Sequence, residues 1–246
     1  MKKKKLQKLL GVGTLIIGVK GKNGIVLGSD KKIIREGGAE SDFEDKIHIF
    51  NTSGKGKPIK ITFVATGYVG IAEDFLEIFE EALKDNIKAG KITNLLDVKF
   101  LAEDMLLSFE ERYASRLQES PLGFMVGGLK NLSQGEARLY TVFPPGFGEK
   151  TKYCGFIGHG SPYARTIAKY LFDREQVSNF SIEKIAERIA IVLYWIGEEV
   201  DSYAGGKPQI VTLKDGNPKF EILKIDEEKI KKRVIKLKET LRNLKL

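Results

Sequence analysis

The sequence predicts an α+β fold: a four-layer αββα sandwich in which two facing β-sheets are each covered by a pair of helices. The first observation is the order of apolar patterns along the 246 residues, which runs strands, two helices, strands, two helices, strands. The second is that two sheets and two helix pairs, stacked in layers, bury every apolar face in these patterns. The third is that no linker divides the chain, so residues 14–223 are expected to form one domain.

The strands in the first part of the chain are marked by short apolar runs. Residues 15–19 and 24–29 flank an Asn-Gly dipeptide, which is a strong signal for a tight turn, so they predict a β-hairpin. Residues 47–50 and 59–65 predict a second pair of strands. The segment between them, residues 51–58, is polar and contains glycine and proline, so we expect a loop that projects from the surface.

Longer segments follow in which apolar residues recur at steps of three or four, the spacing of one face of an α-helix. This spacing predicts four helices, at residues 71–83, 95–113, 163–171 and 182–196. Apolar runs bounded by turn residues predict four further strands, at residues 123–129, 137–143, 209–213 and 219–223.

The C-terminal segment, residues 224–246, is predicted to be an amphipathic helix of about 20 residues. Its apolar residues Ile230, Val234, Leu237, Leu241 and Leu244 follow a 4-3-4-3 spacing. We favour packing of this helix on its own domain over the alternative, a contact with another subunit. The pattern covers too few heptads to indicate a coiled coil.

Composition excludes several classes of function. The formal net charge is +8, but a basic leader, residues 1–13, supplies five of the lysines, and no basic stripe elsewhere indicates nucleic-acid binding. A single cysteine, Cys154, excludes an internal disulfide framework, and with only two histidines it argues against a His/Cys metal site. The leader lacks the apolar core of a secretory signal, and no run is long enough to span a membrane. We therefore expect a cytoplasmic protein that binds neither membrane nor metal.

The residues with the clearest chemical potential are Thr14, Asp30 and Lys46, spaced 16 residues apart. A cut between Gly13 and Thr14 would give Thr14 a free α-amine beside its hydroxyl, and an amine can act as the base that activates a hydroxyl nucleophile. A lysine near that hydroxyl would favour the alkoxide, and a carboxylate would orient the lysine. Taken singly, each residue is more often a strand start or a solvated turn residue. The combination is what favours a catalytic site.

Five segments in order resemble a proteasome β-type subunit, and the resemblance extends from about residue 14 to about residue 213. It implies a fold of the N-terminal-nucleophile hydrolase type, threonine peptidase activity without a cofactor, and assembly into rings. The segments are residues 14–30, Asp45-Lys46-Ile47, Ala65-Thr66-Gly67-Tyr68-Val69-Gly70, Gly158-His159-Gly160-Ser161-Pro162 and Asp201-Ser202-Tyr203-Ala204-Gly205-Gly206.

The resemblance assigns catalytic roles to five residues. Thr14 would be the nucleophile, with its freed α-amine as base. Lys46 would stabilise the alkoxide and Asp30 would orient Lys46. The backbone N–H of Gly67 would bind the oxyanion, and Asp201 would support the α-amine.

Two positions depart from the family pattern, and four further positions are candidates for substrate binding. Ala204 stands where the family has a serine near the α-amine, so a hydrogen bond is lost there. His159 replaces another serine; it either restores a polar contact, carries protons, or is a solvated loop residue. The substrate pocket is expected to be lined by Ala65 and Val69, with acidic residues at its mouth that favour a basic substrate side chain. These acidic residues are Glu44 and Glu73. The alternative is that both are exposed surface charges with no role in substrate binding.

Three functions remain open from the sequence. We favour a self-processing threonine peptidase that acts on peptides or unfolded proteins within a homo-oligomeric ring, with related subunits or an ATPase as further partners. The second is a proteasome-like protein that transfers the acyl group to an amine, as a protein ligase does. The third is a non-catalytic subunit that retains its leader.

Overall fold

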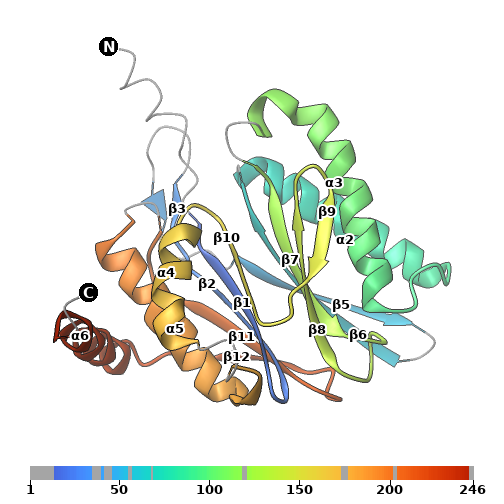
Figure 1. The fold of residues 1–246 in the computed structure, drawn as a ribbon. Coiled ribbons are helices and arrows are strands. Elements are labelled where there is room, and N and C mark those ends of the chain that lie inside the picture. The colour runs from blue at the N-terminus through green and yellow to red at the C-terminus, as the bar shows by residue number, and fades with distance from the viewer. Residues whose placement is uncertain are drawn as a thin grey trace, which may run out of the picture.

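The predicted αββα sandwich is confirmed in the computed structural model (Figure 1). Two five-stranded antiparallel sheets face each other, and helices cover both outer faces. The structure describes residues 14–34, 40–41, 46–54, 57–67, 69–117, 121–172, 177–201 and 204–243.

The first sheet is built around the hairpin that the Asn-Gly turn predicts. Its strand order is β10-β1-β2-β11-β12, and all neighbours are antiparallel. In the hairpin, Gly21 pairs with Gly24 and Ile16 pairs with Ser29, so the start of β1 and the end of β2 reach the same edge. The strands are β1 (Ile16–Gly21), β2 (Gly24–Ser29), β10 (Cys154–Ile157), β11 (Gln209–Lys214) and β12 (Phe220–Leu223).

The second sheet corrects the prediction of a projecting loop at residues 51–58. Gly54 pairs with Lys57, so the ladder of this hairpin continues almost to its tip. The physical reason is that pairing satisfies the backbone N–H and C=O groups, and this overrides the turn-like composition of the segment. The sheet order is β5-β6-β7-β8-β9. Its strands are β5 (Ile47–Gly54), β6 (Lys57–Thr66), β7 (Gly123–Leu129), β8 (Ala137–Phe143) and β9 (Phe147–Lys150).

Helices α2 (Val69–Lys88) and α3 (Leu95–Leu117) cover the second sheet, and α4 (Ser161–Leu171) and α5 (Ile182–Glu199) cover the first (Figure 1). The remaining elements are short: β3 (Ile33–Ile34), β4 (Glu40–Ser41) and the 3-10 turn η1 (Val177–Asn179). Within the described ranges, no helix is long and apolar enough to cross a membrane.

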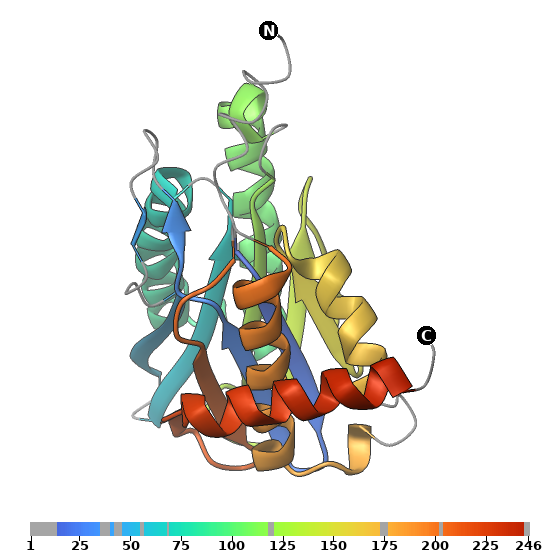
Figure 2. The same cartoon turned by 90° about the vertical axis from the view of Figure 1, so that its left-hand side faces the viewer.

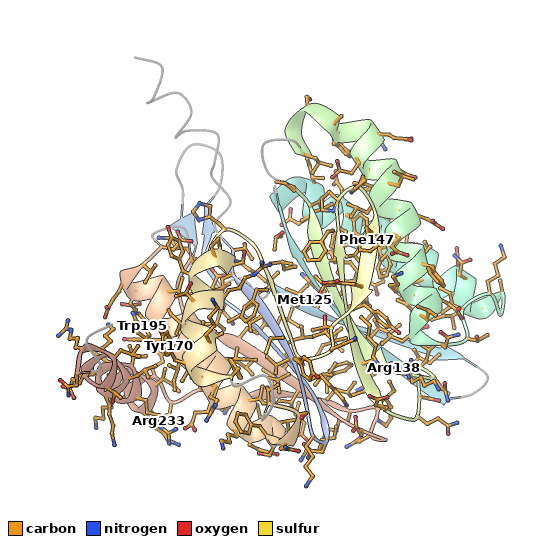
Figure 3. All side chains as sticks on the ribbon, in the orientation of Figure 1. Met125, Arg138, Phe147, Tyr170, Trp195 and Arg233 are labelled. Carbon is orange, nitrogen blue, oxygen red and sulfur yellow. The ribbon has the colours of Figure 1, made fainter. Side chains whose placement is uncertain are left out.

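The layer between the sheets is filled by apolar side chains that alternate with those facing the helices. Met125 of β7 lies in this layer (Figure 3), together with Leu27 and Leu139. Gly18 of β1 lets the sheets approach closely, because a Cβ atom there would lie 2.3 Å from Cδ2 of Leu139. The tight contact fixes the position of β1, and Thr14 lies two residues before this strand.

The C-terminal helix α6 (Glu227–Asn243) packs across α5, as Figure 2 shows, so it lies on its own domain. Ile230 and Val234 are buried in the same apolar cluster as α5. Lys238 lies 5.4 Å above the ring of Trp195 and forms an ion pair with Glu199.

Candidate active site

Thr14 and Asp30 meet because they flank the open end of the β1–β2 hairpin. Thr14 lies two residues before β1, and Asp30 directly follows β2. The backbone N–H of Leu15 donates to Oδ1 of Asp30 at 2.8 Å, and the N–H of Asp30 donates to the Leu15 carbonyl at 3.2 Å. The strand pairing therefore continues into the site and fixes the Asp30 carboxylate beside Thr14.

Lys46 enters the same place from the second sheet, where it directly precedes β5. Its ammonium Nζ donates to Oγ1 of Thr14 at 3.0 Å and to Oδ1 of Asp30 at 3.0 Å. A third donation, at 2.6 Å, goes to the backbone carbonyl of Lys32. An ammonium group has three donors, so these three acceptors fix its orientation. Lys46 thus lies within hydrogen-bond distance of both other side chains of the predicted group, Thr14 and Asp30.

This cluster is buried, which strengthens its electrostatics. The exposed fractions are 4% for Thr14, 1% for Asp30 and 8% for Lys46. Burial raises the pKa of the Asp30 carboxyl above its ordinary value, while the Lys46 charge and the N–H groups of Leu15 and Gly205 act in the opposite direction. With the positive charge of Lys46 at 3.0 Å, a negative charge that develops on the Thr14 oxygen is stabilised more than it would be in water.

Gln209, at the start of β11, joins the two sheets next to Lys46. Its amide Oε1 accepts from the N–H of Ile47 at 2.9 Å, and its Nε2 donates to the Ile47 carbonyl at 3.3 Å. The residue is 4% exposed. The sequence does not predict this contact, since a single polar residue at a strand start carries no signal that it will bind another strand.

Gly158 is a second position that the sequence analysis did not assign to the site. It follows β10 with φ +96°, and a Cβ atom there would lie 2.0 Å from the carbonyl oxygen of Thr14. Only glycine combines this backbone angle with such a close approach. The loop after β10 therefore lies directly against the backbone of Thr14.

His159 and Asp201 form a pair within this region. Nδ1 of His159 lies 2.8 Å from Oδ2 of Asp201, whose side chain is only 2% exposed, while the His159 side chain is 43% exposed. Asp201 also accepts, through its backbone carbonyl, from the N–H of Ala204 at 3.1 Å. Ala204 is 1% exposed and, having a methyl side chain, offers no side-chain hydrogen bond.

The other expected site residues that the structure describes lie on β6, directly after it, and on α2. Gly67 is buried at the end of β6 with φ +126°, and Ala65 is half-buried against the apolar cluster under α2 and α3. Glu73 is exposed on α2. Val69 begins α2, but its side chain lies outside the described residues, as does Glu44 altogether.

A cavity of about 190 Å³ lies away from this cluster and shares no residue with it. Its lining includes Lys20 near the end of β1, Arg138 of β8 and Tyr153 before β10. In the part of the chain that the structure describes, no group of His, Cys, Asp and Glu side chains could hold a metal ion.

Comparison with known proteins shows which family model the sequence matches and which solved structures share the fold. Residues 12–195 match the family model described as "Proteasome subunit". No curated protein sequence matches the chain. Among solved structures, Anbu (ancestral beta-subunit) from Yersinia bercovieri has a TM-score of 0.74 at 12% identity over 94% of this chain and 95% of that one.

Two further solved structures share the fold. An Anbu (Gly-1) mutant from Hyphomicrobium sp. strain MC1 has a TM-score of 0.74 at 13% identity, over 94% of this chain and 97% of that one. The structure titled "Helical Assembly of the Anbu Complex from Pseudomonas aeruginosa" has a TM-score of 0.71 at 14% identity, over 94% of this chain and 95% of that one.

Proposed function

Since the chain belongs to the proteasome subunit family, we propose that it is a threonine-type peptidase that cleaves peptide bonds through an acyl-enzyme on Thr14. The observation that carries the proposal is the contact of Lys46 Nζ with both Thr14 Oγ1 and Asp30 Oδ1, each at 3.0 Å. A hydroxyl next to a buried ammonium is the arrangement that an oxygen nucleophile needs, because the positive charge lowers the energy of the alkoxide.

The proposed reaction uses each group of the cluster. Thr14 Oγ1 attacks the peptide carbonyl carbon, Lys46 stabilises the negative charge on that oxygen, and Asp30 holds Lys46 in place. The backbone N–H of Gly67 binds the oxyanion of the tetrahedral intermediate. The C–N bond breaks, the amine leaves with a proton, and water hydrolyses the ester on Thr14. A cut before Thr14 would supply an α-amine as base, with Asp201 supporting it.

The substrate class that we propose is a peptide or an unfolded protein. Ala65 and Val69 are assigned to the pocket next to the nucleophile, and Glu44 and Glu73 to its mouth. Carboxylates at the mouth would favour a basic substrate side chain, since opposite charges attract. The supporting observation is that Ala65 lies one residue before the end of β6, close in the chain to Gly67.

The intact mass of the purified protein and its cleavage of a peptide library test this proposal together. Loss of residues 1–13 and cleavage by the native chain, both absent in Thr14→Ala, would support a self-processing peptidase. Thr14→Ser keeps a hydroxyl and is the matched control that should retain measurable activity. A native chain that keeps its leader and cleaves no peptide would favour the non-catalytic subunit instead.

Transfer of the acyl group to an amine is the second candidate, and Ala204 is the observation that favours it. The buried methyl of Ala204 supplies no hydroxyl where the family pattern has a serine near the base. Weaker activation of water would give a competing amine more time to react with the ester. Mass spectrometry of a peptide incubated with a second amine separates the two reactions, because transfer gives a joined product and hydrolysis gives two fragments.

We further propose that the chain assembles with copies of itself. The structurally similar Anbu complex from Pseudomonas aeruginosa forms a helical assembly. In this chain the outer face of α3 carries three exposed apolar residues, Leu96, Phe100 and Leu107, which are 40%, 49% and 49% exposed. Such surfaces usually mark contacts between proteins. Sedimentation that gives the mass of a single chain at micromolar concentration would contradict this assembly.

A further inference from the structure

The cavity of about 190 Å³ lies near the turn of the β1–β2 hairpin, at the opposite end of β1 from Thr14, and its walls come from both sheets. Lys20 of β1 lines it from the first sheet. Arg138 of β8, labelled in Figure 3, and Lys150 of β9 line it from the second sheet. Pockets for drug-sized ligands have volumes of about 300–1,000 Å³, so this cavity suits a smaller ligand.

The segment between β9 and β10, residues 151–153, forms another wall and is fixed to both sheets. The N–H of Thr151 donates to the Leu139 carbonyl in the second sheet at 2.9 Å. The N–H of Lys20, in the first sheet, donates to the Tyr153 carbonyl at 2.8 Å. These hydrogen bonds order the wall before any ligand arrives, so a ligand would not have to order it on binding.

Positive charge is in excess around this cavity. Lys20 is paired with Asp215, whose Oδ1 lies 3.0 Å from its Nζ. The one acidic lining residue, Glu136, lies 3.6 Å from Arg138 Nε and balances one further charge. Two positive charges are then left, which a single dianion would neutralise. The cationic lining residues are Lys20, Arg138, Lys150 and Lys152.

The donors of three of these residues are not used by the part of the chain that the structure describes. Arg138 donates no hydrogen bond to it, since Glu136 at 3.6 Å is beyond hydrogen-bond distance, and its Nε is buried. Lys150 and Lys152 are exposed, and neither forms an ion pair or a side-chain hydrogen bond within the same ranges. An anion at the cavity would therefore meet free donors and would break no existing contact.

We propose that this cavity binds a free dianion of the phosphate class, held by Arg138, Lys150 and Lys152. A guanidinium can donate to two oxygens of a phosphate at once, and each lysine adds a compact charge with three donors. The bound ion would connect β8 and β9 to the segment 151–153, which is itself hydrogen-bonded to β1. The cavity shares no residue with the Thr14 cluster, so this site does not depend on the proposed peptidase activity.

Calorimetric titration of the full-length chain with inorganic phosphate tests the site, at a chloride concentration of about 0.15 M that screens diffuse surface charge. One bound phosphate per chain is expected. Acetate carries a single charge and is expected to bind about ten-fold more weakly or less. Lys150→Gln and Lys152→Gln are each expected to weaken phosphate binding about ten-fold, the effect of losing one charge-assisted hydrogen bond.

Lys88→Gln is the matched control, because it removes the same charge from a side chain that is 74% exposed on α2 and outside the cavity. It is expected to bind phosphate as the native chain does. Since Lys150 and Lys152 are exposed, their substitution by glutamine should leave the fold intact, which thermal unfolding of each variant checks.

Nitrogen NMR locates the bound ion. Because Nε of Arg138 is buried, its hydrogen is protected from exchange with water and its resonance should be observable. The resonance is assigned by its absence in Arg138→Lys. Phosphate is expected to shift it in the native chain, with the same midpoint concentration as the calorimetric titration.

Several results would overturn the site. They are a native chain that binds no phosphate at millimolar concentration, acetate binding as tight as phosphate binding, a loss in Lys88→Gln equal to that in Lys150→Gln, or an Arg138 resonance that phosphate does not move. A phosphoserine peptide that binds more tightly than inorganic phosphate would overturn the free ion as the ligand, in favour of a modified protein.

Discussion

Both ends of the β1–β2 hairpin carry a lysine–aspartate ion pair with the same separation of 3.0 Å, but their surroundings differ. At the open end, the side chains of Lys46 and Asp30 are 7% and 2% exposed and every polar atom is held by the backbone around it. At the turn, those of Lys20 and Asp215 are 18% and 34% exposed. The buried pair can act on a neighbouring hydroxyl because water does not screen it, whereas the exposed pair only helps to hold the turn.

Removal of one partner from the buried pair should have the largest effect. Lys46→Met leaves the Asp30 carboxylate buried without its counter-charge, and breaking a buried pair in this way typically lowers the free energy of unfolding by about 3–5 kcal/mol. Denaturation with urea measures the change. The double variant Lys46→Met/Asp30→Leu, which removes both charges, should recover much of the loss. If it is no more stable than Lys46→Met, the burial of an unpaired charge is not the cause.

Gly158→Ala should have the next largest effect on stability, because it disturbs the backbone of the site. The new Cβ would meet the Thr14 carbonyl oxygen, and φ +96° is strained for any residue with a side chain. We expect a loss of about 1–3 kcal/mol in stability, together with loss of reaction at Thr14. Gly90→Ala is the matched control, since its φ is also positive at +71° but no atom lies within 4 Å of the added Cβ. Equal effects of the two substitutions would show that contact with Thr14 is irrelevant.

The contribution of the buried pair to the stability of the fold should depend on pH. Because the folded-state pKa of Asp30 is raised above 3.8, the unfolded chain releases this proton first as pH increases. Stability from Asp30 is therefore complete below pH 3.8 and decreases as pH rises from there through the folded-state pKa. The difference in unfolding free energy between the native chain and Asp30→Asn should shrink over this range. A difference that grows with pH would mean that the pKa is lowered instead.

Lys20→Met should have the smallest effect, about 0.2–1 kcal/mol, as expected for a solvated pair. High salt should reduce the difference from the native chain further, because salt screens exposed charges. Measurement of both variants, Lys20→Met and Lys46→Met, at low and high salt compares the two ends of the hairpin directly. A salt-independent loss at Lys20 would show that the turn pair is shielded from solvent.

The sequence was sufficient to predict most of the fold, because long periodic segments and the Asn-Gly turn carry strong local signals. The strands at residues 123–129 and 137–143 match β7 and β8 residue for residue. β9 and β10 were not predicted. Each strand has only four residues, which is too short to establish an alternating pattern. The extension of β5 and β6 through residues 51–58 was missed because pairing there overrides a turn-like composition.

The residues of the candidate site can likewise be separated into those that the sequence predicts and those that it does not. Thr14, Asp30 and Lys46 were predictable because chemistry restricts which residue types can activate a hydroxyl, and their sequence context resembles a known family. Gln209 and Gly158 were not, since their importance arises from contacts between segments far apart in the chain. The hydrogen bond between His159 and Asp201 is also of this kind: neither residue indicates the other in the sequence.

The hydrogen bonds around Lys46 have a consequence for any activation by cleavage. Thr14 Oγ1 and Asp30 Oδ1 each already lie 3.0 Å from Lys46 Nζ in a sequence that continues through Gly13. Severing the Gly13–Thr14 bond would thus add one protonatable nitrogen without rearranging the scaffold. The uncut and the cut chain would then have nearly the same structure by diffraction and scattering. Cleavage would be detected as a change in mass and in titration.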